Sequence, residues 1–177
     1  DIIGILNSDD FYYNNDVLKL VAETLSDSNI DACYGDLLYV DQNDTSKAIR
    51  YWQSSSYEPR LFGHGWMPPH PTFFFKKSIH DKFGAYFDLQ YPIAADVELV
   101  LRLMYKNKIR TKYIPQILTK MRMGGKTNQS LGNMVKQNIQ VLKAFKKNNY
   151  QASPLKFISL KLFNRLGQYI KREQYAK

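Results

Sequence analysis

The chain opens with the apolar run Ile2-Ile3-Gly4-Ile5-Leu6, which leads directly into the polar group Asn7-Ser8-Asp9-Asp10. A short apolar run that stops at polar residues is typical of a buried strand. Open α/β sheets bind ligands at the carboxyl ends of such strands, so we expect Asp9 and Asp10 at a ligand-binding edge. Carboxylate oxygens suit Mg²⁺ or Mn²⁺ and, through the metal, a diphosphate. The alternative is that Asp9 or Asp10 only caps a following helix.

The first residue, Asp1, already lies against this expected strand. A strand of this apolarity needs neighbouring strands if it is to be buried. We therefore expect the first part of the fold to precede Asp1 in a longer protein.

Composition indicates an ordered globular protein. The 177 residues are 44% hydrophobic and 14% aromatic, which is enough for one domain with a real core. The single cysteine, Cys33, excludes an internal disulfide framework and a cysteine-based zinc site. No apolar run approaches the roughly 18 residues of a membrane span.

Charge divides the chain sharply. Residues 1–100 hold 7 basic and 15 acidic residues, whereas residues 101–177 hold 18 basic residues and 1 acidic residue. The net charge of +9 therefore combines a half of −8 with a half of +17. This asymmetry favours an anionic partner for the second half, such as a membrane surface, a phosphorylated substrate or nucleic acid.

Apolar spacing predicts alternating helices and strands. A helix capped by Asn15 should bury Leu18, Val21, Ala22 and Leu25, and strand–helix–strand order is consistent with a parallel sheet. Expected strands cover residues 32–40, 48–53, 72–76, 111–114 and 117–121, with Pro115 separating the last two. Expected helices cover residues 78–83 and 96–106, and residues 54–70 should form an irregular loop.

Two basic helices are expected to end the chain. The first covers roughly residues 129–148 after a break at Gly124-Gly125, with Met134, Ile139, Leu142 and Phe145 facing inward. The second starts at Ser153-Pro154. Its apolar stripe consists of Leu155, Ile158, Leu162, Leu166 and Ile170, and its flanking cations are Lys156, Lys161, Arg165, Lys171 and Arg172. Such a helix fits an anionic membrane interface or packing on its own domain, and both interpretations stay open.

An ordered set of motifs resembles the family-2 glycosyltransferases of GT-A fold, of the kind that builds bacterial capsule, O-antigen or exopolysaccharide. The segments that carry the resemblance are residues 1–10, 34–36 (YGD), 70–77 (HPTFFFKK), 83–88 (FGAYFD), 95–103 (ADVELVLRL) and 121–125 (MRMGG). The resemblance implies a partial GT-A, Rossmann-like mixed sheet flanked by helices, with basic amphipathic helices at the C-terminus. Residues 1–128 would be the C-terminal part of the catalytic domain, and residues 129–177 a basic helical extension.

The resemblance also implies roles on the metal side of a site. Asp9 matches the second acidic position of the family's metal motif and would hold Mg²⁺ or Mn²⁺. Asn7 stands at the first position, where many relatives have Asp, and its amide would hydrogen-bond the ribose or sugar of a nucleotide-diphosphate sugar. Asp10 would assist through water or orient the loop.

On the acceptor side, Asp96 matches the family's catalytic base at the start of a helix, where the ionised carboxylate is stabilised. An ordinary helix N-cap is its alternative. His70 matches a position near the substrate cleft, although a packing role fits equally. Arg122 is expected to reach a phosphate, and Met123 replaces a histidine that the family often carries after this arginine. Arg102 follows Asp96 on its helix and is expected only to form a salt bridge.

The implied function is inverting transfer of a sugar from a nucleotide-diphosphate donor to a glycan acceptor, expected to be lipid-linked, at the cytoplasmic face of the membrane. The alternatives are a non-catalytic membrane-surface-binding fragment and an inactive remnant of such an enzyme. If strands that hold the nucleotide base precede Asp1, this chain alone should bind donor poorly. Nucleic acid is disfavoured as a partner because the aromatic residues lie mainly in expected core strands.

Overall fold

Nine consecutive buried residues form the centre of the structure. The computed structural model describes residues 1–123 and 131–170, and its central strand is β3, Ala32–Val40. The other strands are β1 (Ile2–Gly4), β2 (Phe11–Tyr12), β4 (Ala48–Trp52), β5 (Phe74–Lys76) and β6 (Thr111–Arg122). The helices are α1 (Val17–Ser26), η1 (Pro59–His64), η2 (His70–Thr72), α2 (Lys77–Phe83), α3 (Ala95–Leu101), η3 (Arg102–Lys106), α4 (Leu131–Lys147) and α5 (Pro154–Ile170).

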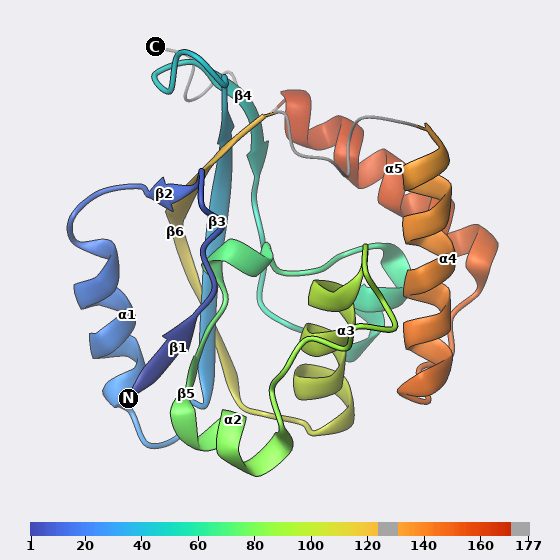
Figure 1. Cartoon of the computed structure of the whole chain (residues 1–177), viewed down its shortest axis with the longest axis horizontal. Coiled ribbons are helices and arrows are strands. Elements are labelled where there is room, and N and C mark those ends of the chain that lie inside the picture. The colour runs from blue at the N-terminus through green and yellow to red at the C-terminus, as the bar shows by residue number, and fades with distance from the viewer. Residues whose placement is uncertain (124–130, 171–177) are drawn as a thin grey trace.

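The sheet is mixed, and helices cover both of its faces (Figure 1). Its strand order is β1-β5-β3-β6-β2, and β4 pairs with β3 beyond the short β5. Strand β5 is antiparallel to both β1 and β3, and β6 is parallel to β3. Strands β1, β3 and β6 therefore run in one direction, so their carboxyl ends face the same edge of the sheet.

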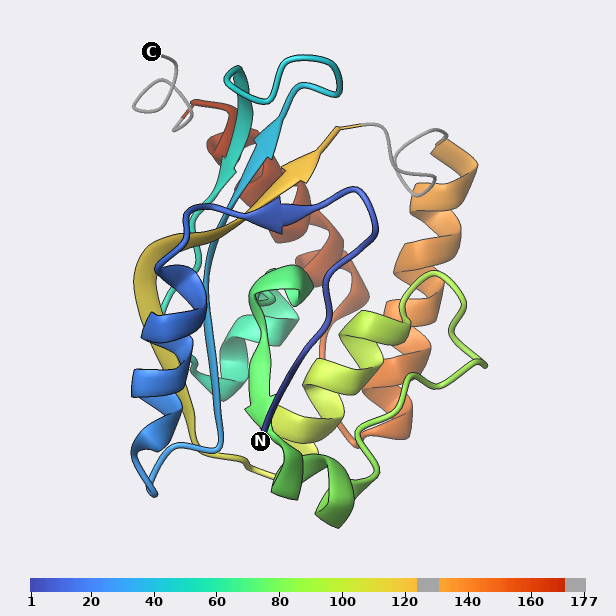
Figure 2. The ribbon, with the colours of Figure 1, turned by 60° about the vertical axis from the view of Figure 1, so that its left-hand side comes forward.

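The expectation of a buried first strand is wrong. Strand β1 lies at one end of the strand order and pairs with β5 (Figure 2), and Ile2 is 40% exposed. An apolar run does not distinguish a central strand from an outer one, because pairing partners come from elsewhere in the chain. The parallel relation between β1 and β3 is present, but β5 lies between them.

Pro115 does not divide two strands, contrary to the expectation. Strand β6 is continuous, and its pairing with β3 shifts register opposite the proline, between Tyr34 and Leu37. Proline is tolerated at such an irregularity because a bulged residue need not donate to the ladder. Gly35 allows β6 to lie close to β3 at this point, since a Cβ at position 35 would lie 2.5 Å from Leu118 Cγ.

Helix α1 covers one face of the sheet with Val17, Val21 and Leu25. The expected contribution of Leu18 is wrong, because Leu18 is 53% exposed. The expected cap by Asn15 is wrong: the N-cap position of α1 is Asp16, which makes no side-chain capping bond. The buried residues recur at exactly one spacing, i to i+4, which places Leu18 on the outer side.

The opposite face carries α2, α3 and α4. The expected face of the third helix is confirmed: Val97, Val100, Leu101 and Met104 are all buried, and the helix continues after α3 as the π-helical turn η3. In α4, Phe145 is buried as expected. Ile139 is exposed, contrary to expectation, because Val141, Ala144 and Phe145 form the inward face.

Helix α5 turns its expected apolar stripe outward. All five residues of the stripe are exposed, whereas Phe157 is buried against Phe145. The stripe therefore does not pack on the rest of the described chain. No helix within residues 1–123 and 131–170 combines the length and apolarity needed to cross a membrane. The expected roles of Gly124, Gly125, Lys171 and Arg172 lie outside the described residues.

Candidate functional site

The acidic segment after β1 forms a tight loop. The Asp10 N–H donates to the Asn7 carbonyl at 3.1 Å, and Asn7 Nδ2 donates to Asp10 Oδ2 at 2.7 Å. Asp10 is buried, whereas Asp9 is exposed. Neither aspartate caps a helix, because α1 begins only at Val17. The capping alternative is therefore excluded.

The environment of Asp10 disfavours its charged form. Burial is the main reason that the pKa of Asp10 is raised, and the neighbouring charge of Asp9 adds to it. Hydrogen bonding by Asn7 and the nearby His70 oppose the shift. Asp10 Oδ1 is also buried without a hydrogen-bond partner among the described residues. A bound cation would relieve both costs.

His70 and Asp96 form a close pair. His70 begins η2, and its Nδ1 lies 3.2 Å from Oδ2 of Asp96 in the first turn of α3. Asp96 Oδ1 accepts the N–H of Val97 at 2.8 Å. Both side chains are about one-quarter exposed, so a substrate can reach them. An imidazole that contacts a carboxylate can orient it for proton transfer.

Arg122 ties the end of β6 to two loops. Its Nε donates to the Asp9 carbonyl at 3.2 Å and its Nη1 to the Gln42 carbonyl at 2.9 Å. The guanidinium carbon also lies 5.6 Å from the centre of the Phe11 ring. In this arrangement Arg122 holds the acidic loop in place, and its expected contact with a phosphate stays a prediction.

These residues come from four separate parts of the chain and meet at one edge. Asp10 lies after β1, His70 lies within electrostatic range of Asp10, and Asp96 contacts His70. Arg122, at the end of β6, contacts the loop of Asp9. The site therefore lies where the carboxyl ends of the parallel strands gather, as the rule for open α/β sheets describes.

A divalent cation fits this loop. Among the described residues, no three His, Cys, Asp or Glu side chains are grouped as a metal centre. Mg²⁺, however, is often bound by one or two carboxylates together with water and substrate phosphates. Asp9 offers an exposed carboxylate and Asp10 a buried oxygen without a partner, so these two residues would hold the ion.

The sequence did not assign to this site four residues that lie near it: Tyr39, Arg50, Lys161 and Arg165. Burial raises the pKa of Tyr39, at the end of β3. Tyr39 also interacts electrostatically with Arg50, Arg165 and Asp10. Lys161 of α5 lies within electrostatic range of Arg165 and Asp96. The only signal in the sequence was the spacing of Lys161 and Arg165, four residues apart on the same helix.

Asp36 in the YGD segment is hydrogen-bonded within the sheet. It is buried, and it accepts hydrogen bonds from the hydroxyl of Tyr113 at 2.8 Å and the N–H of Ser54 at 2.8 Å. The hydroxyl of Tyr51 also donates to it. These bonds join β3, β6 and the segment after β4, so this carboxylate stabilises the sheet.

Glu98 and Arg102 anchor α3. Glu98 is fully buried and lies 3.1 Å from Arg102 Nε, which confirms the expected salt bridge of Arg102. Lys147 Nζ lies 3.7 Å from Glu98 Oε1, and Asn148 Nδ2 donates to it at 3.3 Å. Arg102 also donates to the carbonyls of Gly84 and Tyr86. This network fixes the helix that presents Asp96.

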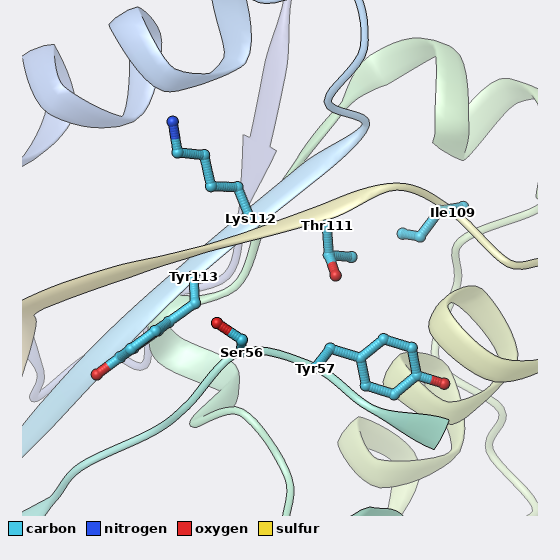
Figure 3. A pocket seen from close by; sticks show the side chains of 6 residues that line it. All are labelled: Ser56, Tyr57, Ile109, Thr111, Lys112 and Tyr113. Carbon is cyan, nitrogen blue, oxygen red and sulfur yellow. The ribbon is translucent and has the colours of Figure 1, made fainter. Parts of the chain in front are cut away.

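A cavity of about 340 Å³ lies away from this site (Figure 3). Its lining includes Thr111 and Tyr113 at the start of β6, whereas the candidate site is at the strand's other end. Figure 3 shows Lys112 extending from the opposite side of the strand, away from Ser56 and Tyr57. With no carboxylate in its lining, the cavity gives no argument for the chemistry considered above.

Comparison with known proteins adds no relationship: no family model matches the chain, and no curated protein matches it significantly.

Proposed function

We propose that this chain contributes the metal-binding and base side of an inverting glycosyltransferase of GT-A type. The enzyme would move a sugar from a nucleotide-diphosphate donor to a lipid-linked glycan acceptor in the synthesis of a bacterial surface polysaccharide. The observation that supports this most is that His70 lies between Asp10 and Asp96 in space: it is within electrostatic range of Asp10, in the acidic loop after β1, and it contacts Asp96 at the start of α3.

The chemistry follows from these residues. The acceptor hydroxyl oxygen attacks the anomeric carbon, the bond from that carbon to the diphosphate oxygen breaks, and the electron pair leaves with the diphosphate. Asp96 takes the hydroxyl proton, and His70, 3.2 Å away, holds the carboxylate in position. A divalent ion held by Asp9 and Asp10 would neutralise the departing charge. Direct attack inverts the anomeric centre.

Binding and turnover test this proposal separately. Calorimetry with the full-length protein should show that nucleoside diphosphates bind in the presence of Mn²⁺ and that Asp9→Asn weakens this binding. Asp16→Asn is the control, because Asp16 is an exposed aspartate at the start of α1. Asp96→Asn should keep the binding and reduce release of nucleoside diphosphate from a nucleotide sugar by a factor of about 10² or more.

Two results would contradict the proposal. One is the absence of any metal-dependent binding of nucleoside diphosphates. The other is unchanged turnover in the Asp96→Asn variant.

A peripheral position on the cytoplasmic face of an anionic membrane is the second part of the proposal. The outward stripe of α5 exposes large apolar side chains, and Phe163 beside it is 75% exposed. The chain has no acidic residue between Glu98 and Glu173, so both C-terminal helices lack negative charge. Apolar burial together with positive charge is what anchors a helix in an anionic interface. The same observation favours the alternative of a non-catalytic membrane-binding protein.

Vesicle flotation tests the membrane contact. The chain should float with vesicles that contain an anionic phospholipid and much less with purely zwitterionic vesicles. Leu162→Ser combined with Phe163→Ser should abolish flotation, whereas Leu18→Ser, at an apolar position on α1 that is also exposed, should not. Equal flotation of all three proteins would contradict the contact. Flotation without any transfer activity would support the non-catalytic alternative.

A further inference from the structure

A group of cations surrounds Tyr39 beside the acidic loop. The guanidinium carbon of Arg50, on β4, lies 3.7 Å from the centre of the Tyr39 ring and 5.8 Å from that of Tyr169 on α5. Arg165 is also within electrostatic range of Tyr39. Strand β4 and helix α5 thus bring positive charge to one place from distant parts of the chain.

Arg50 is held there at a cost. It is only 4% exposed, and its Nε has no hydrogen-bond partner among the residues that the structure describes. A buried donor without a partner is destabilising, because it has lost its bonds to water. A phosphate oxygen would satisfy such a donor, and arginine matches phosphate geometry well.

Lys161 adds a second cation on the inner side of α5. Its Nζ donates to the amide oxygens of Asn138 at 2.7 Å and Gln137 at 3.3 Å, which are neutral acceptors. Burial, and then the charge of Arg165, lower the pKa of Lys161 to about 8, while Asp96 opposes the shift. An ammonium group in this position gains stability from a nearby anion.

The packing of α5 fixes this inner face. A Cβ on Gly65 would lie 2.5 Å from the Cα of Lys161, so the helix backbone rests directly on the glycine. Asn164 Nδ2 donates to the carbonyl of His64 at 3.1 Å, and Phe157 is buried on the same side. Phe157, Lys161 and Arg165 are each four residues apart, so they share one face of the helix.

We propose that Arg50, Lys161 and Arg165 form an anion site for a phosphate or diphosphate group, next to the pair of His70 and Asp96. The inference deepens the proposed function, which supplies the two sources of such a group: the nucleotide donor and a phosphorylated lipid acceptor. The binding itself depends only on the cations and needs no metal.

Titration with inorganic pyrophosphate in EDTA tests the site. Lys161→Gln should weaken binding by on the order of tenfold, since it removes one charged hydrogen bond. Lys156→Gln is the matched control, because Lys156 is exposed on the same helix, and its affinity should not change. Arg165→Gln should weaken binding as Lys161→Gln does, and circular dichroism checks that each variant is folded.

Lys161→Arg keeps the charge and provides a second measurement. Wild-type affinity should fall relative to this variant as the pH rises through about 8, because Lys161 loses its proton near that pH while arginine does not. The charged groups that act on Lys161 are Arg165 and Asp96, and both are the same in the two proteins. Absence of pyrophosphate binding, or equal affinities of Lys161→Gln and Lys156→Gln, would overturn the site.

Competition identifies the source of the phosphate. Displacement of pyrophosphate by a nucleoside diphosphate in EDTA assigns the site to the donor, and displacement by a short-chain polyprenyl diphosphate assigns it to the acceptor. The result is separable from the proposed function. Pyrophosphate binding that depends on Lys161, in a protein without transfer activity, would retain the anion site and reject the glycosyltransferase.

Discussion

Replacing Glu98 by alanine removes the carboxylate that joins α3 to α4. Glu98 is fully buried, and the side chain of its partner Arg102 is only 16% exposed, so after the change the guanidinium of Arg102 stays largely buried without its carboxylate. Removing one member of a buried ion pair typically costs 3–5 kcal/mol. Lys147 is 42% exposed and can turn to water, which places the expected loss near the lower limit, about 3 kcal/mol. Because a domain of this size is stable by about 5–15 kcal/mol, the loss is readily measured.

Urea denaturation followed by circular dichroism measures the free energy of unfolding. Asp81→Ala is the matched control, since Lys77 and Asp81 form an exposed pair at the same i,i+4 spacing, and this change should have no measurable effect. Glu98→Gln keeps the side-chain volume and should cost less than Glu98→Ala. If Glu98→Ala costs as little as Asp81→Ala, the buried network does not stabilise α3.

Two further changes test the acidic loop and the position of α5. Because the pKa of Asp10 is raised above 3.8, the folded state binds its proton more tightly than the unfolded state, so the charged side chain destabilises the fold above the folded pKa. Asp10→Asn should therefore increase the free energy of unfolding at pH 7 but not below pH 3.8; an equal gain at both pH values, in urea titrations, would refute this. Gly65→Ala should cost more than Gly84→Ala, because both glycines have positive φ but only at Gly65 would the Cβ meet the backbone of Lys161. Strain alone predicts about 1–2 kcal/mol for each, so equal losses on thermal or urea unfolding would contradict the close contact of α5.

Local patterns in the sequence predicted several elements well. Strand β3 has the expected bounds, because a strand that is buried on both faces is apolar nearly throughout, and Asp36 is its one charged residue. The face of α3 followed from spacing, and α2 ends at Phe83 as expected, just before Gly84, which has a φ of 60°. These features depend on interactions within a few residues, which the sequence contains directly.

Apolar patterns gave wrong predictions of burial where burial depends on which other element packs against the residue. Ile2 and Leu18 are apolar yet exposed, because neither an outer strand nor the outer side of a helix is marked by composition. The stripe of α5 was correctly read as a helical face, but its periodicity does not say whether that face meets the domain or the surroundings. Phe157, which was not part of the stripe, fixes the helix instead.

The sequence by itself determined which residues carry chemistry: an acidic loop after an apolar strand, and an aspartate at the start of a helix. Tertiary structure alone decided that they meet. His70 reaches Asp96 across 26 positions of sequence, and Lys161 comes within electrostatic range of Asp96 from the far end of the chain. The physical reason is that charge and hydrogen bonding act over a few ångströms in space, and only the packing of α3, η2 and α5 around the sheet sets those distances.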